Sequence, residues 1–256
     1  MTDTIFWDCE ANAFGISRVH EYVIQTGPYR YSYTSDLHAC MRDFNALADR
    51  IQKFAPNHKI VCCLGHHANF RYGVYKKYKS NRRGIKKAAC YAEFRKYIET
   101  HWETICLPNV EADDVVGIKY EYGDLIYSMD KDLKTIAGIH LQENGDLEIV
   151  SQLDANRNFF KQVLCGDSSD GYGGCPGIGA KHKCFDSDEW KDCARERDFW
   201  TFVQKRFALA HARVKEVYGT ADTLSVAMQM ARLARILRPG EYDFDSDRPV
   251  LWAGPS

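Results

Sequence analysis

Short apolar runs alternate with longer amphipathic stretches through the first two thirds of the chain, and only amphipathic stretches follow. Short apolar runs suit buried strands, whereas apolar residues three or four apart suit one face of a helix. This alternation predicts an α/β protein, with a mostly parallel central sheet, helices on both of its faces, and a helical subdomain after it. The predicted strands are residues 4–8, 59–64 and 124–128. The predicted helices are residues 36–55, 88–103, a segment from 111, a short helix after 130, then 155–165, 196–218 and 222–238, with a hairpin near 143–146.

A glycine-rich segment at residues 166–181 joins two carboxylates, Asp167 and Asp170, to a tight turn. Its second half, Pro-Gly-Ile-Gly-Ala-Lys, predicts a hairpin between two short helices, because glycine permits close backbone approach and helix N-termini offer free N–H groups. Phosphate is the natural ligand of such a turn. A turn that only reverses the chain is the alternative. The residues expected to bind phosphate are Gly177, Gly179 and Lys181.

Further carboxylates stand where strands or helices are expected to end or begin. One group opens the predicted helix from 111, and like charges so close together repel unless a cation lies between them. A pair spaced two apart follows the predicted strand 124–128, at the edge where open parallel sheets place their ligands. Each has a simpler alternative, as an acid at a helix N-terminus that faces water. These carboxylates are Asp8, Glu111, Asp113, Asp114, Asp130 and Asp132.

A set of oxygen ligands selects hard cations, so we expect Mg²⁺ or Mn²⁺. Two such ions about 3.5 to 4 Å apart form the clamp that hydrolyses phosphodiesters. A zinc site built from Cys62, Cys63, His66 and His67 is a weaker alternative, because adjacent cysteines rarely bind one ion.

Three motifs together carry a family resemblance. They are the Glu-x-Asp-Asp helix, the Ser-x-Asp-Lys-Asp-Leu strand end, and the Gly-Asp-x-x-Asp-Gly-Tyr loop with its Gly-x-Gly hairpin. With these motifs in this order, the chain resembles the 5′-nuclease family, which includes flap endonucleases and polymerase 5′-exonuclease domains. It is most similar to the replication 5′-exonucleases of short-tailed bacteriophages, also in residues 228–238, 241–242 and 251–252. The resemblance implies a PIN-like nuclease fold with a helix-hairpin-helix motif for DNA.

The resemblance also implies roles for the carboxylates. It assigns Asp8, Glu111, Asp113 and Asp130 to a first metal ion, Asp132, Asp167 and Asp170 to a second, and Asp114 to both. Many relatives carry an aspartate after the second strand, where this chain has His66. Either His66 replaces that carboxylate or the site has one ligand fewer. The resemblance further implies a K⁺ ion at the hairpin.

Residues 71–87 contain eight basic residues and no acid. Tyr72, Tyr75 and Tyr78 recur every three residues, so one helical face could stack on bases while lysines such as Lys76 and Lys86 neutralise phosphates. A tyrosine stripe packed on the core is the alternative. In relatives the matching segment arches over the active site, and this resemblance implies that Lys79 and Arg82 contact the reacting phosphate as catalytic cations.

Composition fits an intracellular enzyme. The chain has 256 residues, 45% of them hydrophobic, and a net charge of −1 that conceals separate acidic and basic segments. No apolar run approaches the length of a membrane span and the opening residues contain no export signal, so we expect a monomer in the cytoplasm, that of the host cell if a phage encodes it. The ten cysteines are expected to be reduced, with Cys62, Cys63 and Cys165 in the core.

These features predict a metal-dependent 5′ to 3′ exonuclease that acts on duplex DNA and on RNA-DNA hybrids during phage replication. A structure-specific flap endonuclease and a non-catalytic DNA-binding protein on a nuclease scaffold are the alternatives. We expect residues 1–165 to form the nuclease core, with a basic arm at 66–90. Residues 166–256 are expected to form the helix-hairpin-helix and a C-terminal helical region packed on that core.

Overall fold

The computed structural model describes residues 3–255, which form two compact units. Unit 1 holds the chain through His67 together with Gly84–Lys131 and Gly138–Ile149. Unit 2 holds Ala68–Arg83, Asp132–Ala137 and the chain from Val150 onward. The observed division therefore differs from the expected one at residue 165, because part of the basic segment and the helix before residue 165 belong to unit 2. The prediction about an export signal falls partly on residues 1 and 2, which lie outside the described part.

A six-stranded sheet with the order β5-β4-β1-β6-β7-β8 organises unit 1. Strands β5, β4, β1, β6 and β7 pair in parallel. The short turn at residues 142–146 joins β7 to β8, and a connection of this length permits only an antiparallel pair. The mostly parallel sheet is thus confirmed. The strands are β1 (Thr4–Asp8), β4 (Lys59–Leu64), β5 (Thr104–Cys106), β6 (Leu125–Tyr127), β7 (Gly138–Leu141) and β8 (Leu147–Val150).

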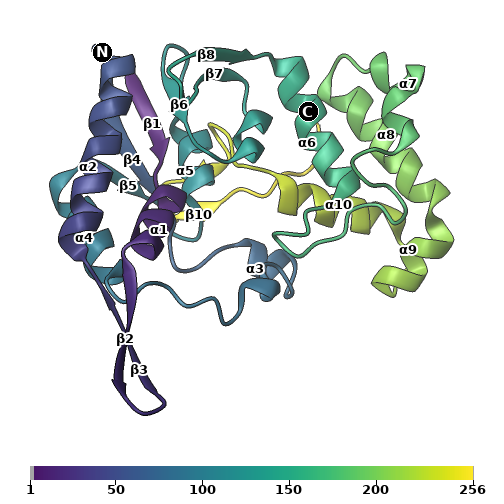
Figure 1. Ribbon diagram of the computed structural model, residues 1–256. Coiled ribbons are helices and arrows are strands. Elements are labelled where there is room, and N and C mark those ends of the chain that lie inside the picture. The colour runs from purple at the N-terminus through teal and green to yellow at the C-terminus, as the bar shows by residue number, and fades with distance from the viewer. Residues whose placement is uncertain (1–2, 256) are drawn as a thin grey trace. The chain divides into compact units, whose positions relative to one another are not determined.

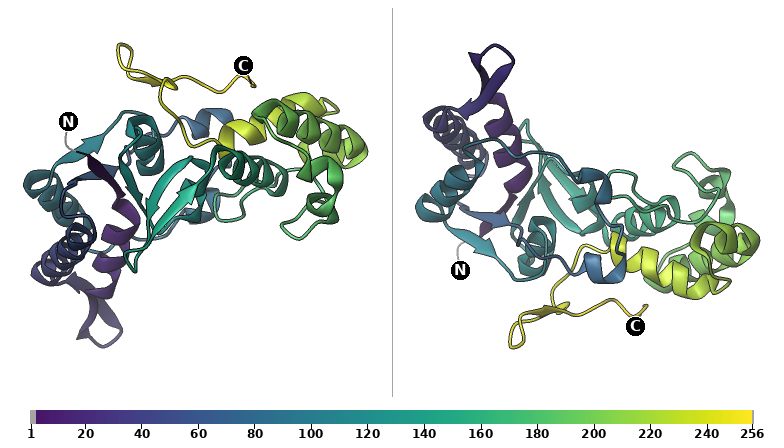
Figure 2. Two further views of the ribbon diagram at one scale, coloured as in Figure 1. Left: turned by 90° about the horizontal axis from the view of Figure 1, so that it is seen from above. Right: turned by 90° about the horizontal axis from the view of Figure 1, so that it is seen from below.

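Helices cover both faces of this sheet, as predicted. Helices α1 (Glu10–Val19), α2 (Leu37–Phe54) and α4 (Tyr91–His101) pack together on one side of the strands (Figures 1 and 2). Trp7 of β1 points to this side and stacks on Phe44 of α2 at 4.6 Å between ring centroids. Because side chains alternate along a strand, Phe6 lies on the opposite face, where α5 (Ala112–Lys119) packs against β1 and β4.

An exposed two-stranded hairpin extends from unit 1 between α1 and α2 (Figure 1). It consists of β2 (Glu21–Gly27) and β3 (Arg30–Ser35), which pair only with each other. The sequence did not predict this hairpin, nor helix α1 before it. Neither strand has a buried face, and the alternation of tyrosine with serine or threonine over residues 31–34 lies in a strand exposed on both sides.

Unit 2 is built mainly from helices around an aromatic core. The rings of Phe160 and Phe199 stack at 5.7 Å between centroids, and Trp252 of the C-terminal segment packs edge-on against Trp200 at 5.0 Å. The elements are α3 (Arg71–Val74), η1 (Ser80–Arg82), α6 (Gln152–Cys165), η3 (Lys183–Asp186), α7 (Asp188–Lys191), α8 (Glu196–Leu209), α9 (His211–Tyr218), α10 (Thr223–Ala234), β9 (Tyr242–Asp243) and β10 (Arg248–Pro249). The 3₁₀ turn η2 (Lys131–Thr135) crosses from unit 1 into unit 2.

Arg71, which belongs to the predicted basic arm at 66–90, is buried inside this unit. Its guanidinium donates to the carbonyl oxygens of Leu233 at 3.0 Å and Arg235 at 2.6 Å, at the C-terminus of α10. A cation is favourable there, because the last carbonyls of a helix carry partial negative charge. Arg71 is therefore a structural residue and does not face solvent.

Two predictions about the helices of unit 2 are wrong. No α-helix follows the glycine hairpin directly, because His182 accepts the N–H of Cys184 at 3.1 Å and starts a 3₁₀ turn, η3. The single helix expected over 196–218 is two helices, which change direction at Ala210 and bury Val214 of α9 in the core. Within residues 3–255, no helix is long and apolar enough to cross a membrane.

The cysteines follow the prediction with one exception. All ten are free thiols, and Cys62 and Cys63 of β4 are fully buried. Cys165, at the end of α6, is only partly buried, because it lies in the last turn of the helix before the chain reverses at Gly166.

Candidate active site

Asp8 is the last residue of β1, and Asp130 follows β6, the adjacent parallel strand of unit 1. Ser128 links them: its hydroxyl donates to Asp8 Oδ2 at 2.8 Å and accepts the backbone N–H of Asp130 at 2.9 Å. Both carboxylates therefore occur at the carboxyl edge of the sheet, where open α/β sheets bind ligands.

The carboxyl group of Asp8 is buried, and its negatively charged form is unfavourable there. Its pKa is raised to about 6, mainly by burial and in smaller part by the negative charges of Asp130 and Glu10, against the hydrogen bond from Ser128, which lowers it. A buried carboxylate with negative neighbours is stabilised by a bound cation, since the cation offsets both the desolvation and the repulsion.

Glu111, Asp113 and Asp114 open α5, which follows the short strand β5. Asp114 is fully buried, and its Oδ2 accepts the backbone N–H of Glu111 at 3.1 Å. Asp113 Oδ1 accepts the N–H of Asp114 at 2.7 Å. Part of this acidic group therefore caps the helix N-terminus, but Asp114 does not face water as the simpler alternative required.

A carboxylate from another element, which the sequence pattern did not indicate, lies at the end of β4. His66 stands at this end, and its Nδ1 accepts the N–H of Asn109 at 3.2 Å. Beside it, the N–H of Gly65 donates to Glu10 Oε2 at 3.1 Å. Glu10, from the start of α1, therefore places its negative charge at the strand end that lacks an acid of its own. In the sequence, the only indication of this carboxylate was that Glu10 lies two residues after Asp8.

In unit 2, the loop at residues 166–174 presents Asp167 and Asp170. Backbone hydrogen bonds between Asp167 and Tyr172 close the loop at 2.9 and 3.0 Å. Gly166 and Gly174 both have positive φ, and a Cβ on Gly174 would lie 2.3 Å from the nitrogen of Gly166. Only glycine fits at these two positions, so the glycines of the motif shape the loop that carries the carboxylates.

Asp132 and Asp167 are close enough to share a hydrogen bond. Burial raises the pKa of Asp167, but the hydrogen bonds from Ser169 and Asp170 outweigh it, so that the pKa lies below its ordinary value. Asp132 Oδ2 also accepts from Gln162 of α6 at 2.8 Å. Two carboxyl groups at this separation require a shared proton or a cation between them.

Tyr172 lies beside these carboxylates. Burial, followed by the charges of Asp167 and Asp170, raises the pKa of its hydroxyl well above the ordinary value. This hydroxyl is buried, and within residues 3–255 it has no hydrogen-bond partner. An unsatisfied hydroxyl next to acids fits a hydrated cation such as Mg²⁺, which keeps several water molecules when it binds to proteins.

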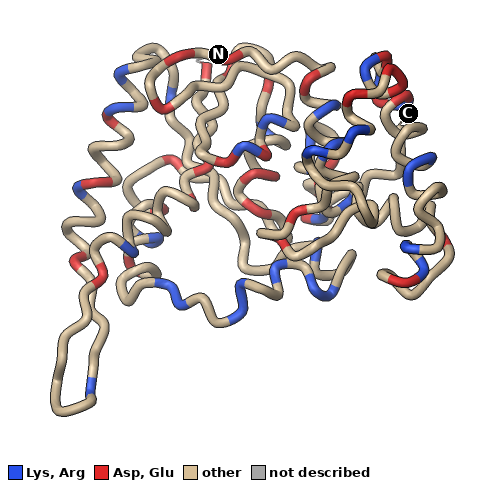
Figure 3. The backbone as a smooth tube through the Cα atoms, turned by 45° about the vertical axis from the view of Figure 1, so that its right-hand side comes forward, with Lys and Arg blue, Asp and Glu red and all other residues tan. Residues whose placement is uncertain are grey.

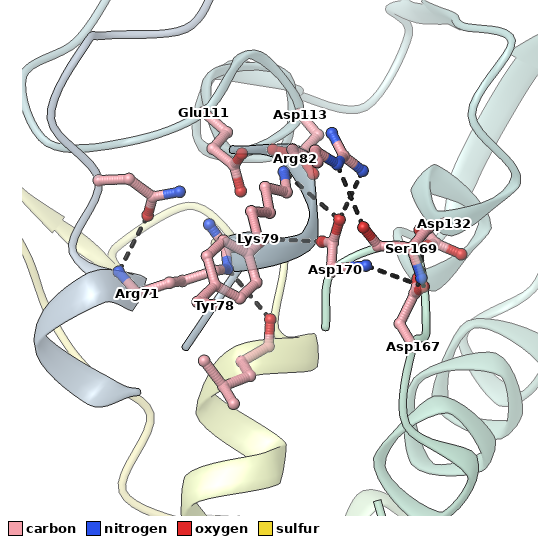
Figure 4. Close-up of polar contacts among 12 residues, drawn as sticks. Arg71, Tyr78, Lys79, Arg82, Glu111, Asp113, Asp132, Asp167, Ser169 and Asp170 are labelled. Carbon is pink, nitrogen blue, oxygen red and sulfur yellow. Dashed lines mark hydrogen bonds and ion pairs between the residues drawn. The ribbon is translucent and has the colours of Figure 1, made fainter. Parts of the chain in front are cut away.

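Lys79 and Arg82 converge on Asp170 (Figure 4). Arg82 Nη2 lies 2.7 Å and Lys79 Nζ 3.6 Å from Asp170 Oδ1. The expected helix is absent: Lys79 has a left-handed backbone with φ 50°, and its N–H donates to the carbonyl of Asp170 at 2.7 Å. The turn η1 and its N-cap Lys79 bring the two cations together without an α-helix.

Tyr78 does not belong to an exposed aromatic face, and the prediction that it stacks on bases is wrong. It is 2% exposed, its ring packs against Tyr172 at 6.5 Å, and its hydroxyl donates to Asp170 Oδ2 at 2.7 Å. Tyr75 is partly buried against the same core. Tyr72 remains exposed, so the three tyrosines do not share one face. The core-packing alternative applies to two of them.

The basic residues of this segment fall into both units. Lys76 is exposed in unit 2, and Lys86 is exposed in unit 1, where its Nζ lies 4.1 Å from the ring centroid of Tyr33. Figure 3 shows positive residues following one another along this part of the chain. The exposed cations are available to a polyanion, as the composition predicted.

The glycine hairpin of unit 2 adjoins an open pocket of about 370 Å³. Arg206 and Arg213 contribute to its lining, together with Gly177 and His182. Gly177 has φ 91°, and Gly179 faces open space. Lys181 is exposed. Arg206 is ion-paired with Glu189 at 2.9 Å, so the guanidinium of Arg213 beside the glycine turn is the group of this lining that suits a phosphate.

The fit of these residues to metal ions follows from their chemistry. No group of three or more His, Cys, Asp or Glu side chains is arranged to hold a metal ion anywhere in residues 3–255. The carboxylates instead occur as neighbours, such as Asp132 with Asp167. Their oxygen atoms and the unsatisfied hydroxyl of Tyr172 fit a hard, hydrated cation better than zinc.

Comparison with known proteins assigns the family. A family model described as 5′-3′ exonuclease, N-terminal resolvase-like domain, matches residues 16–159. The chain belongs to this family. The expectations of a 5′-nuclease, of an enzyme and of a 5′ to 3′ exonuclease are thereby confirmed.

Two relatives of this exonuclease come from bacteriophages. The exonuclease of Escherichia phage T7 is 28% identical over 203 residues, covering 68% of this chain and 67% of the relative. The exodeoxyribonuclease of Enterobacteria phage T3 is 28% identical over 200 residues, covering 68% of this chain and 66% of the relative. The chain thus spans about two thirds of the length of each.

Solved structures with a similar fold include T5 5′-exonuclease with bound zinc, which is 16% identical, covers 91% of this chain and 100% of its own, and has a TM-score of 0.48. The T5 D15 flap endonuclease in a complex with DNA and metal ions is 14% identical, covers 91% of this chain and 99% of its own, and also has a TM-score of 0.48. At these scores the likeness supports no conclusion about this exonuclease.

Proposed function

We propose that this exonuclease hydrolyses duplex DNA, and the RNA of RNA-DNA hybrids, from 5′ ends with two divalent metal ions. The observation that carries the proposal is the link between Asp8 and Asp130 through Ser128, at the carboxyl edge of the sheet. Membership in the 5′-3′ exonuclease family supports the direction of hydrolysis. The name of the T3 relative supports DNA as the substrate.

The residues proposed to hold metal are the eight carboxylates predicted from the sequence. Within unit 1 these are Asp8, Glu111, Asp113, Asp114 and Asp130, and within unit 2 they are Asp132, Asp167 and Asp170. Bound Mg²⁺ or Mn²⁺ supplies an activated water and neutralises charge on the leaving oxygen. The chain itself keeps the carboxyl groups in place: Ser128 orients Asp8, Gln162 orients Asp132, and Ser169 orients Asp167.

Lys79 and Arg82 are proposed to bind the reacting phosphate. Negative charge increases on the phosphate oxygens during hydrolysis, and cations held in place before the reaction stabilise that charge most. The backbone bond from Lys79 to Asp170 and the bond from Arg82 Nε to the carbonyl of Ser169 at 3.1 Å hold both residues against the loop that carries Asp170. Their position is thus set by the protein before DNA arrives.

The glycine hairpin and the exposed lysines are proposed to hold the rest of the DNA. Gly177, Gly179 and Lys181 bind phosphates through backbone N–H groups and one ammonium, without reading sequence. Their carbonyl oxygens could share a K⁺ ion with a phosphate. Lys76 and Lys86 add phosphate contacts that depend on salt. We place this reaction in the host cytoplasm and assign it to a monomer.

The product lengths from three substrates test this function. Blunt, nicked and flapped duplexes with a 5′ label are incubated with the protein and Mg²⁺. An exonuclease releases short labelled products from all three from the first time point. A flap endonuclease releases the intact flap, and a non-catalytic DNA-binding protein releases no label; either result contradicts the proposal.

A further inference from the structure

The β2–β3 hairpin of unit 1 has an unusual surface. Residues 22–26 and 30–34 are all exposed, and Val23, Tyr31 and Tyr33 are 57%, 62% and 49% exposed. A two-stranded hairpin without a packed face has little stability of its own. Aromatic residues kept in such a position indicate a surface that binds a partner.

One face of this hairpin gathers the rings. Val23 pairs with Tyr33 and Gln25 pairs with Tyr31, and directly paired residues project from the same face of an antiparallel ladder. Tyr22 pairs with Thr34, and Ile24 with Ser32, on the opposite face. The first face is called the tyrosine face below and consists of Val23, Gln25, Tyr31 and Tyr33.

The outer part of the hairpin carries positive charge only, whereas the acidic Glu21 at its base is bonded to Arg18 and to the N–H of Ala89. Residues 22–35 contain Arg30 and no acid, and Figure 3 shows no acidic residue along the outer part of this hairpin. Lys86 Nζ lies 4.1 Å from the ring centroid of Tyr33. The N–H of Ala89 donates to Glu21 Oε1 at 3.2 Å. This bond holds the segment 84–90, which includes Lys86, against the base of the hairpin. Exposed aromatic rings next to cations, with no acidic residue between them, suit a polyanion that carries flat bases, because the bases can stack on the rings and the cations attract the negative charge.

We propose that the tyrosine face binds the unpaired DNA strand that remains when the opposite strand is removed from its 5′ end. This inference rests on the proposed exonuclease function, because that reaction produces such a strand. Bases of any sequence stack on Tyr31 and Tyr33, since every base has an aromatic face. Lys86 and Arg30 neutralise neighbouring phosphates. The hairpin thereby keeps the enzyme on partly degraded DNA.

Fluorescence anisotropy tests the proposal with two labelled DNAs, a blunt duplex and the same duplex with an unpaired 3′ overhang of thymidines. Ca²⁺ replaces Mg²⁺ so that the DNA stays intact. The wild-type protein should bind the overhang substrate more tightly than the blunt one. Tyr31→Ala and Tyr33→Ala should each weaken overhang binding by roughly 5- to 100-fold, the range expected for loss of one stacked base. Binding of the blunt duplex should stay unchanged.

Two matched variants separate stacking from folding of the hairpin. Tyr22→Ala removes an equally exposed tyrosine from the opposite face and should keep wild-type overhang binding. Tyr33→Phe keeps the ring and should also bind like wild type. Overhang binding that is unaffected by Tyr31→Ala and Tyr33→Ala overturns the proposal, and so does an equal loss in Tyr22→Ala. Release of a 5′ label by wild-type protein with Mg²⁺, measured in parallel, tests the exonuclease function separately.

Discussion

Arg82 and Asp170 form an ion pair in unit 2, with 2.7 Å between Nη2 and Oδ1. The same carboxylate accepts the hydroxyl of Tyr78 at 2.7 Å through Oδ2. One carboxylate thus fixes a cation and a buried ring that lie in the basic segment. Loss of each partner should have a different consequence, because the cation is exposed at the loop and the ring is part of the core.

Substitution of the two cations should affect the chemical step. Lys79→Ala and Arg82→Ala are each expected to lower the single-turnover rate by roughly 10²- to 10³-fold at saturating enzyme, as when one preorganised charge donor is lost. Lys76→Ala is the matched control, since Lys76 is exposed in the same segment. It should weaken DNA binding and reduce the salt dependence by about one unit of slope. Equal effects of all three variants on binding, with unchanged rates, would make the segment an electrostatic guide only.

Removal of one hydroxyl tests the structural role of Tyr78. Tyr78→Phe should lower the free energy of unfolding by about 1 to 2 kcal/mol, because it deletes a buried hydrogen bond to a charged group. Tyr72→Phe is the control, since Tyr72 is exposed and should change stability by less than about 0.5 kcal/mol. Urea unfolding measures both. If the two variants are equally stable, the bond from Tyr78 to Asp170 does not support the fold.

The buried carboxyl group of Asp8 predicts a dependence of stability on pH. Its pKa of about 6 in the folded protein lies above the unfolded value of 3.8, so the folded protein binds more protons between these values and becomes less stable as the pH rises through them. In EDTA, Asp8→Asn should be more stable than wild type by about 3 kcal/mol above pH 6. The difference should vanish as the pH falls to about 4. Urea unfolding at pH 4, 5, 6 and 8 checks this, and a difference that does not depend on pH would contradict it.

The glycine hairpin offers a paired test of binding and stability. Gly179 faces open space with an ordinary backbone, so Gly179→Val should fold normally and weaken duplex binding without selecting among sequences. Gly177 has φ 91°, so Gly177→Ala should lower the free energy of unfolding by about 1 kcal/mol. Anisotropy in Ca²⁺ and thermal unfolding measure the two effects. Unchanged duplex affinity of Gly179→Val would remove the hairpin from the DNA-binding surface.

Elements with a buried side and a clear end were predictable from the sequence. Strands β1 and β4 are apolar runs, and α2 begins at Asp36, whose side chain accepts the N–H of Ala39 at 2.9 Å, and ends before Pro56. Helix α1 was missed because Cys9 provides no cap, and β2 and β3 because neither has a buried face. The local pattern of apolar and polar residues reflects which side of an element is buried. Elements without a buried side therefore give little signal in the sequence.

The carboxylates proposed for the site were chosen from motifs and spacing, which give no information about the contacts around them. The ion pair between Arg82 and Asp170 joins residues 88 apart in the chain, and the contact of Glu10 with Gly65 joins residues 55 apart. The burial of Tyr78 depends on Tyr172, which lies far along the sequence. Such contacts depend on tertiary packing, and a periodic pattern carries no information about them.

The central claim is that the carboxylates of both units serve metal-dependent chemistry. Single-turnover cleavage of a 5′-labelled blunt duplex measures this most directly, with wild type, Asp130→Ala and Asp132→Ala, each in Mg²⁺ and in EDTA, and with DNA affinity measured alongside. The account predicts rapid release of label by wild type in Mg²⁺, none in EDTA, and a loss of at least several hundredfold in each variant, with DNA binding retained. Near wild-type turnover in either variant, or cleavage that persists in EDTA, would contradict it.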